Sequence, residues 1–320
     1  MTTATATMGF GERAKLWSVA VRAYSFPASI APVLLGSVFA YASGVSFNLH
    51  NWLNFILALI AGVLFQVGCN LINDYYDFAK GIDHEGSFGG SGVLVSGQMT
   101  PREILVGAYT SLFIGSLIGL YFVSQLGFGS PAGLTMLGIG VFGALGAIWY
   151  TSGNASAKYN ALGTPLVFTM MGIGYVCGAY LIQAGTVSWQ AILVSLPIGF
   201  LVTAILHAND TRDITEDRQA GIRTAATLLG ATGARAYYSF LLFAPYATVL
   251  ILAVLGILPW LSLLALLTLP LAIPLHRLFW SIRDEKHEAL MPTVEGTAKL
   301  HMAFGVLMSL GVLIGHRFGI

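Results

Sequence analysis

Long apolar segments separated by short polar connections make up almost the whole chain. Nine segments are long enough to cross a membrane: 16–43, 50–79, 102–126, 132–150, 162–184, 188–212, 235–255, 258–280 and 297–315. A spanning helix needs about 20 mainly apolar residues, whereas a barrel strand alternates apolar and polar side chains at period two. The apolar runs carry no such alternation and therefore predict helices.

We predict an all-α fold, a polytopic transmembrane helical bundle of about nine spans. The composition agrees, because 56% of the residues are hydrophobic and 9% are charged, with a mean hydropathy of +0.77. These values exclude an ordinary water-soluble globular chain. Residues 1–320 are interpreted as one integral-membrane domain, and 1–15 as a short cytoplasmic N-terminal segment. The first span is too long for a signal peptide, so we expect it to be retained.

Charged residues divide the connections into two kinds. The connections 44–51, 126–131, 184–188 and 255–259 contain no Lys, Arg, Asp or Glu. The other connections and the adjoining helix ends carry Lys80, Arg102, Lys158, Arg212, Arg218, Arg223, Arg235, Arg277, Arg283, Lys286 and Lys299, together with the acidic residues. Positive charge marks cytoplasmic loops. We therefore expect a plasma (inner) membrane protein with a cytoplasmic active site and an external carboxyl terminus.

The second predicted span ends in a polar stripe. Gln66, Asn70, Asn73, Asp74 and Asp77 are spaced along this segment, and at 100° per residue they fall within about 100° of arc. The side chains therefore share one face of the helix.

The sixth predicted span ends in a second stripe of the same kind. Thr203, His207, Asp210, Asp213 and Asp217 spread over about 120°. Asp213 lies 136 positions after Asp77, which we interpret as equivalent places in two pseudo-symmetric four-helix halves that are followed by a ninth helix.

Two clusters of carboxylates in spanning helices require a counter-charge. Each ionisable residue costs about 2.5–3.5 kcal/mol on insertion scales, and neighbouring carboxylates repel one another. Carboxylate and amide oxygens suit a hard cation, and Mg²⁺ binds one or two carboxylates together with substrate phosphates. The stripes therefore predict a Mg²⁺ cofactor. Cys69 and Cys177 both lie in spans, and they are interpreted as small buried side chains.

The two stripes and their flanks resemble a known family. The runs 73–83 (NDYYDFAKGID) and 209–217 (NDTRDITED), with Gly221 and Thr224 beyond, resemble the signature segments of the UbiA superfamily of membrane prenyltransferases. Agreement extends to 25–32, 150–151, 158–163 and 297–300, so the resemblance covers about 16–315. The nearest branch is that of the 1,4-dihydroxy-2-naphthoate polyprenyltransferases of menaquinone synthesis.

The resemblance implies roles for individual residues. The catalytic residues would be Asn73, Asp77, Asp213 and Asp217, and the metal ligands would be Asn73, Asp74, Asp77, Asp83, Asp210, Asp213 and Asp217. Cations suited to the diphosphate oxygens are Arg22, Lys80, Lys158, Arg212 and Arg223. The substrate pocket would include Asn70, Tyr76, Tyr150, Tyr159 and His207, with Tyr75 and Phe78 as further aromatic faces.

Two positions depart from the superfamily pattern. Position 81 is Gly and the acid follows at Asp83, a shift that the menaquinone branch shares. Thr164 stands where that branch usually has an acid. The Gly-rich stretch 86–92 lacks a phosphate-loop lysine, and we interpret it as a lid over the site.

The resemblance implies an enzyme, a membrane-embedded polyprenyltransferase. It would transfer a polyprenyl group from an isoprenyl diphosphate to an aromatic acceptor, with 1,4-dihydroxy-2-naphthoate first, giving demethylmenaquinone, pyrophosphate and CO2. The partners are then the polyprenyl diphosphate, the aromatic acceptor and the lipid bilayer, and the sequence suggests no nucleic acid. We expect the prenyl tail to leave the pocket sideways between helices into lipid.

Other functions remain open at this stage. The acceptor could be 4-hydroxybenzoate, homogentisate or a lipid alcohol. A secondary transporter or anion channel would place its site near the bilayer midplane, whereas these acids gather at one face. A CDP-alcohol phosphotransferase would need a long Asp-Gly signature that this chain lacks.

Overall fold

The computed structural model describes residues 9–86, 89–153, 155–282 and 287–319. Ser87, Phe88, Arg283, Lys286 and the start of the predicted N-terminal segment lie outside the described residues. The helical elements are α1 (Phe10–Ala20), η1 (Ala23–Ser25), α2 (Pro27–Ala42), α3 (Leu49–Ala79), α4 (Pro101–Leu126), α5 (Pro131–Trp149), α6 (Gly163–Val167), η2 (Phe168–Gly174), α7 (Tyr175–Ala184), α8 (Trp189–Arg212), α9 (Ile214–Gln219), α10 (Ala225–Val254), η3 (Trp260–Thr268), α11 (Leu269–Ser281), η4 (His287–Leu290) and α12 (Met291–Phe318).

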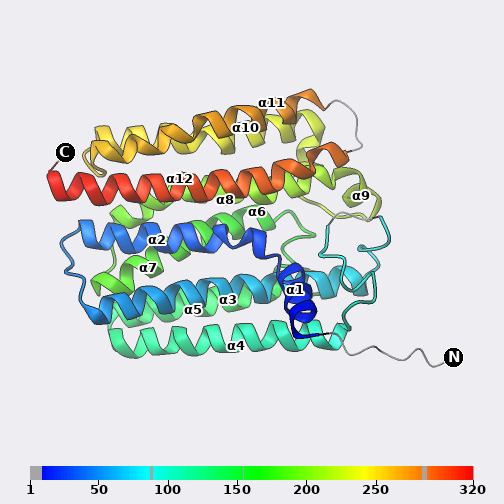
Figure 1. The fold of residues 1–320 in the computed structure, drawn as a ribbon, viewed down its shortest axis with the longest axis horizontal. Coiled ribbons are helices and arrows are strands. Elements are labelled where there is room, and N and C mark those ends of the chain that lie inside the picture. The colour runs from blue at the N-terminus through cyan, green and yellow to red at the C-terminus, as the bar shows by residue number, and fades with distance from the viewer. Residues whose placement is uncertain (1–8, 87–88, 154, 283–286, 320) are drawn as a thin grey trace.

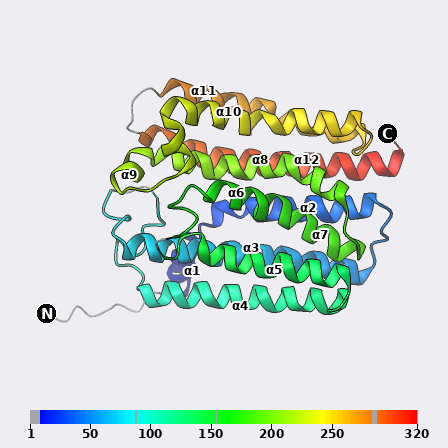
Figure 2. The ribbon, with the colours of Figure 1, turned by 180° about the vertical axis from the view of Figure 1, so that it is seen from behind.

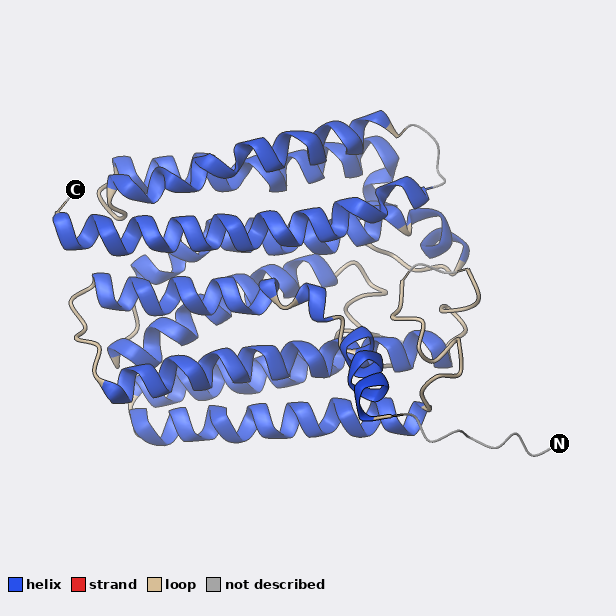
Figure 3. Ribbon diagram, in the orientation of Figure 1, coloured by secondary structure: helices blue, strands red, loops and turns tan. Residues whose placement is uncertain are grey.

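The described part of the chain forms an all-helical bundle, which confirms the predicted fold class (Figures 1 and 3). Within it, nine helical segments are long and apolar enough to cross a membrane. They run side by side, with α9 and the long loops at one end of the bundle and the short connections at the other (Figures 1 and 2). We call the end with α9 the acidic end, because Asp77 and Asp213 lie there.

Capping residues fix where the long helices begin. Thr100 accepts a hydrogen bond from the Glu103 backbone N–H at 3.2 Å, and the Glu103 carboxylate accepts one from the Thr100 N–H at 2.9 Å. Pro131 follows the cap Ser130 at the start of α5 in the same way that Pro101 follows Thr100. These are the usual starting signals of a helix, since a side-chain oxygen satisfies an N–H that has no partner within the helix.

The predicted first span, 16–43, is in fact two helices. Arg22 adopts the left-handed conformation, with φ of 53°, and separates α1 from α2. A left-handed residue cannot continue a right-handed helix, so α1 turns away across the bundle (Figure 1). The membrane-spanning part therefore begins at Ala23. Two further helices are longer than the predicted spans 235–255 and 297–315. The first, α10, begins at Ala225 and has a kink at Gly230, and the second, α12, covers Met291–Phe318.

Glycines let the spans approach closely. A Cβ atom on Gly36 of α2 would lie 2.2 Å from the Val176 carbonyl oxygen of α7. One on Gly172 of η2, a π-helical segment, would lie 2.5 Å from the Gly199 Cα of α8. Small residues at helix contacts allow tight packing in lipid, where the hydrophobic effect provides no driving force for helix association. Here they bring α7 and η2 against α2 and α8.

Apolar packing surrounds a central space from two sides. The largest buried cluster joins α2, α8, α10 and α12, with fully buried Leu35, Ile198, Tyr238 and Phe304. Separate clusters join α3 to α4 and to α5 and α7. The site is built where these clusters face one another. The twofold relation between the halves stays a prediction at the level of whole helices.

Candidate active site

A cavity of about 280 Å³ reaches from the acidic end into the bundle. The predicted residues that line it are Arg22, Asn70, Asn73, Tyr150, Lys158, Asp210, Asp213 and Asp217. They come from α3, from α8 and α9, and from the connections beside them. The two polar stripes, more than 120 residues apart in sequence, therefore open on one space. Its remaining lining is largely apolar.

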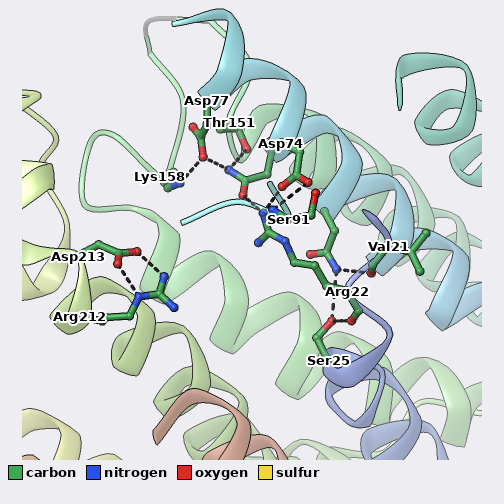
Figure 4. A network of polar contacts seen from close by, with 12 residues as sticks. Val21, Arg22, Ser25, Asp74, Asp77, Ser91, Thr151, Lys158, Arg212 and Asp213 are labelled. Atoms are coloured by element: carbon green, nitrogen blue, oxygen red, sulfur yellow. Dashed lines mark hydrogen bonds and ion pairs between the residues drawn. The ribbon is translucent and has the colours of Figure 1, made fainter. Parts of the chain in front are cut away.

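Asp77 is the most tightly held acid of the first stripe. Its side chain is 1% exposed. The Lys158 Nζ donates to Asp77 Oδ2 at 2.6 Å, and the Asn73 Nδ2 donates to the same oxygen at 2.7 Å. The Tyr159 hydroxyl donates to the other oxygen. Figure 4 shows the Lys158 and Asp77 side chains pointing toward each other from separate segments.

Arg22 ties the start of the first span to the same network. Its guanidinium forms an ion pair with Asp74 and donates to Asn73 Oδ1 at 3.2 Å. The backbone N–H of Ser91 also donates to Asp74, at 3.3 Å. The left-handed turn at Arg22 is what directs this side chain toward α3 rather than along its own helix.

Only one of the three acids of the second stripe is paired with a cation among the described residues. Arg212 holds Asp213 in a fork, with Nε to Oδ1 at 2.6 Å and Nη2 to Oδ2 at 2.7 Å (Figure 4). Asp210 and Asp217 line the cavity, each 7% exposed. Neither has an ion-pair partner among the described residues. Two buried carboxylates therefore face the cavity without a cation in contact.

Both stripes end in the same backbone turn. The Asp77 carbonyl accepts the N–H of Ile82 at 2.9 Å, and the Asp217 carbonyl accepts that of Ile222 at 2.7 Å. The glycine before each isoleucine is left-handed, with φ of 70° at Gly81 and 71° at Gly221. This is a common helix ending, in which glycine adopts a conformation that strains other residues. It explains why position 81 is Gly and the acid appears only at Asp83.

The shared turn corrects the predicted register between the halves. Asp77 corresponds to Asp217 rather than to Asp213, as the two aspartates precede their glycines by the same four positions. In this register Asn70 corresponds to Asp210 and Asn73 to Asp213. The first stripe carries amides where the second carries carboxylates. The second side of the cavity is therefore the more negative.

Burial raises the pKa of two acids outside the spans. Burial is the main reason why the pKa of Asp217 rises to about 8, and the negative charge of nearby Asp210 adds to it. Burial likewise raises the pKa of Asp83 to about 6, with the charge of nearby Asp77 as the second cause. Burial acts to lower the pKa of Lys158, but the charge and hydrogen bond of Asp77 together with the charge of Asp217 raise it overall. A positive charge that entered between the carboxylates would favour their ionised forms.

The donor set fits a hard divalent cation shared with a substrate. Among the described residues no group of three or more His, Cys, Asp or Glu side chains converges to hold a metal by itself. Mg²⁺, however, is usually held by one or two carboxylates with the phosphates of a substrate. Asp210 and Asp217, buried and without a contacting cation, provide oxygen ligands of that kind.

The Gly-rich loop passes between the two stripes. A Cβ atom on Gly89 would lie 3.4 Å from Asp83 Oδ1 and 3.8 Å from Asp213 Oδ2, and one on Gly90 would lie 2.1 Å from Asp83 Oδ2. A side chain at position 90 would therefore collide with Asp83, and one at position 89 would contact both acids. The predicted position over the site agrees with this arrangement, whereas its movement as a lid stays a prediction.

Several predicted site residues lie beside the cavity rather than in its lining. Lys80 is exposed, donates to the Gly153 carbonyl at 2.7 Å and lies 3.9 Å above the Tyr159 ring. His207 Nε2 donates to the Ala234 carbonyl at 2.8 Å, within the contact between α8 and α10. The Arg223 side chain is exposed, while its backbone pairs with Asn160.

The aromatic lining differs from the one predicted. Of the five aromatic side chains expected there, Tyr150 lines the cavity, whereas Tyr76 stacks edge-on against Tyr75 at 5.2 Å. Tyr24, Phe65 and Tyr175 line it instead. Helix periodicity does not place Phe65 on the polar face of α3, since it lies about 80° from Asn73. Nor does it indicate Tyr24, since the break at Arg22 places it.

Two polar residues that the sequence placed near the site make contacts that it did not indicate. Thr151 is fully buried and accepts from Asn73 Nδ2 at 3.4 Å. Gln66 donates to the Ser25 carbonyl at 2.7 Å and so fastens α3 to the start of α2. Thr164, where the resemblance leads one to expect an acid, has a buried hydroxyl without a hydrogen-bond partner among the described residues, and it lies beside Tyr150 and Asp210.

The sequence of the chain matches a known protein family over most of its length. The model of the UbiA prenyltransferase family matches residues 29–304. The chain belongs to this family. It is thus an integral membrane enzyme, a prenyltransferase, as the resemblance implied.

The chain is about one-third identical in sequence to named relatives. It is 35% identical over 307 residues to UbiA prenyltransferase domain-containing protein 1 of Xenopus tropicalis, a match that covers 95% of this chain and 84% of the relative. The protein of the same name in Homo sapiens is 35% identical over 92% of this chain and 82% of its own length. These names do not specify an acceptor, so the menaquinone branch is not established by them.

Solved structures share the fold. A UbiA homolog from Aeropyrum pernix aligns with a TM-score of 0.65 at 18% identity, covering 89% of this chain and 97% of the homolog. A UbiA homolog from Archaeoglobus fulgidus, bound to GPP and Mg²⁺, aligns with a TM-score of 0.59 at 16% identity, covering 92% of this chain and 99% of the homolog.

Proposed function

We propose that the protein transfers a polyprenyl group from an isoprenyl diphosphate to 1,4-dihydroxy-2-naphthoate, with Mg²⁺ as cofactor. The observation that carries the proposal is the composition of the cavity, in which carboxylates of the second stripe, amides of the first and the cations Arg22 and Lys158 occupy one end and apolar side chains line most of the rest. A diphosphate suits the first part and an isoprenoid the second. The Archaeoglobus homolog bound to GPP and Mg²⁺ supports this class of donor and metal.

The chain's own residues would divide the work on the leaving group. Asp210, Asp213 and Asp217 on one side and Asn73 and Asp77 on the other offer oxygens to the cation, which would stabilise the negative charge of the departing diphosphate. Lys158 and Arg22 line the same end and would bind phosphate oxygens directly, as point charge and fork. Lys80 and Arg223, at the entrance, would attract the anion rather than hold it.

Bond changes at the acceptor then follow. The allylic C–O bond breaks and its electron pair leaves with pyrophosphate. The ring carbon that carries the carboxylate forms the new C–C bond, and loss of CO2 returns the electron pair of the broken bond to the ring. The immediate product is the quinol form of demethylmenaquinone. Tyr150, Phe65 and Tyr175, which line the cavity, would keep water from the allylic cation and face it with aromatic rings.

The proposal includes an orientation in the membrane. Basic and acidic connections gather at the acidic end, and positive charge favours the cytoplasm. We propose that the active site opens to the cytoplasm in the plasma (inner) membrane.

A parallel product assay tests the acceptor. Purified protein with Mg²⁺ and geranylgeranyl diphosphate is offered 1,4-dihydroxy-2-naphthoate, 4-hydroxybenzoate, homogentisate or a lipid alcohol. We expect a prenylated product, pyrophosphate and CO2 with the naphthoate, and loss of all three on addition of EDTA. Product from another acceptor alone would sink the branch assignment and keep the prenyl transfer. No pyrophosphate release with any pair would favour transport instead.

A further inference from the structure

The cavity is much deeper than a diphosphate and a ring require. Along α3 its lining runs from Asn73 to Ala58, fifteen residues or roughly 22 Å of helix. The far part is apolar and lies between α3, α4, α5 and α7, with Val33, Phe122, Met136 and Ile182 among its walls. A long apolar occupant would fit along this axis inside the bundle.

One wall of this deep part is formed mainly by glycine and alanine. On α5 the lining residues are Met136, Ile139, Gly140, Gly143, Gly146 and Ala147, which recur every three or four positions and so share one helix face. The face is bulky at Met136 and small from Gly140 onward. The α5 wall therefore widens toward the active site.

These glycines do not serve close helix packing. A Cβ atom on Gly140 or Gly143 would meet nothing within 4 Å, unlike one on Gly36, which would strike the α7 backbone. Glycine inside a helix costs about 1 kcal/mol relative to alanine. Because no neighbouring helix approaches Gly140 or Gly143, the feature they preserve is the open width of the cavity.

Three helices contribute buried side chains to the far end. Phe122 of α4, Met136 of α5 and Ile182 of α7 are each 5–6% exposed. Next to Ile182, the Gln183 amide accepts from Asn51 Nδ2 at 3.1 Å and donates to the Asn51 carbonyl at 3.1 Å. This amide pair joins α7 to α3 just beyond the apolar end.

We propose that the prenyl tail of the donor lies lengthwise inside the bundle against Gly140 and Gly143, and that this face together with Met136 sets the longest tail accepted. The inference rests on the proposed function, and it replaces the expectation that the tail leaves sideways into lipid at the active site. Each added isoprene unit would extend toward Met136. A side chain placed nearer the active site would therefore exclude shorter tails than one placed deeper.

The first experiment compares leucine at three positions of α5. Gly143→Leu, Gly140→Leu and Gly138→Leu each add the same side chain, but Gly138 does not line the cavity and has open space beside it. kcat/KM is measured with geranyl, farnesyl and geranylgeranyl diphosphates. We expect Gly143→Leu to lower both the farnesyl-to-geranyl and the geranylgeranyl-to-geranyl ratio of kcat/KM at least tenfold, and the deeper Gly140→Leu to lower mainly the geranylgeranyl-to-geranyl ratio. Gly138→Leu should leave every ratio within twofold of wild type.

A second experiment does not depend on turnover. In a Cys69→Ser, Cys177→Ser background, Gly140→Cys and Gly138→Cys are labelled with a membrane-permeant maleimide in the presence of each diphosphate and Mg²⁺. We expect geranylgeranyl diphosphate to slow labelling at position 140 at least fivefold, geranyl diphosphate to have little effect there, and neither to affect position 138.

The two experiments separate this inference from the proposed function. Unchanged donor ratios in all three leucine variants, or equal labelling at position 140 with and without the long donor, would overturn the internal path. Protection at position 140 without product from any acceptor would uphold the tail site and reject the transfer reaction. Retained turnover of geranyl diphosphate shows that a leucine variant is folded.

Discussion

Lys158 reaches from the connection after α5 to Asp77 at the end of α3, and its Nζ lies 2.6 Å from Asp77 Oδ2 inside the protein. The two residues are 81 positions apart in sequence. Lysine here does two things, as it neutralises a buried carboxylate and presents a positive charge to the cavity. Four predictions follow from this arrangement and its surroundings.

Replacing Lys158 should reduce turnover more than binding. Lys158→Met removes a cation at the place where negative charge develops, and loss of one such donor costs about 10²–10³ in kcat. We expect a fall of that size, with partial recovery in Lys158→Arg. Lys299→Met, which removes an exposed lysine whose side chain is 78% accessible, serves as the control. Wild-type kcat in Lys158→Met would contradict the role.

Neutral aspartate variants test the two stripes. Asp77→Asn and Asp213→Asn keep the side-chain size but remove charge from the oxygens offered to Mg²⁺, so pyrophosphate release should fall below detection. The protein should still purify from the membrane with an unchanged elution profile. Asp83→Asn should have a weaker effect, because Gly81 displaces this acid from the helix. If either Asp77→Asn or Asp213→Asn kept most of its Mg²⁺-dependent activity, the role assigned to that aspartate would be wrong.

Cysteine labelling tests the orientation. Glu85 follows α3 at the acidic end, Thr186 lies in the short connection between α7 and α8, and both are exposed. The native Cys69 and Cys177 can be replaced by serine. In intact cells an impermeant maleimide should label Thr186→Cys, and it should label Glu85→Cys only after the cells are opened. Labelling of both from outside would reject the predicted orientation.

Gly36→Ala should destabilise the fold. Its Cβ would lie 2.2 Å from the Val176 carbonyl oxygen, so α2 and α7 must separate, and overpacking of this kind costs about 1–3 kcal/mol. We expect a lower thermal midpoint in detergent. Gly138→Ala, which adds the same methyl group where nothing lies within 4 Å, should not lower it. Equal midpoints for the two variants would show that the close approach carries no such cost.

The sequence was most informative where one physical constraint dominates. In lipid every backbone polar group must find a partner within the span, so long apolar runs had to be helices, and most of their boundaries came out within a few residues. Charge placement located the acidic end. The spacing of Asn73 and Asp77 identified a polar face of α3, because helix periodicity decides which side chains share a face. The second stripe was predicted on one helix, but α8 ends at Arg212, so Asp213 and Asp217 reach the cavity through the turn into α9.

Other features depended on single backbone conformations that no hydropathy pattern reveals. The left-handed turn at Arg22 divides the first predicted span and brings Tyr24 to the cavity. The turns at Gly81 and Gly221 set the register that pairs Asp77 with Asp217. Predicted pocket residues such as His207 face a neighbouring helix instead.

The sequence by itself thus determined the helices and the family, and it predicted which acids carry the proposed chemistry, because each depends on local periodicity or on short motifs. Only the tertiary structure decided which cation meets which acid, as Lys158 with Asp77 and Arg22 with Asp74. It alone also turned the small face of α5 into the wall of a deep cavity. The physical reason is that a helix face acquires a function from what stands opposite it, and that depends on how the helices pack.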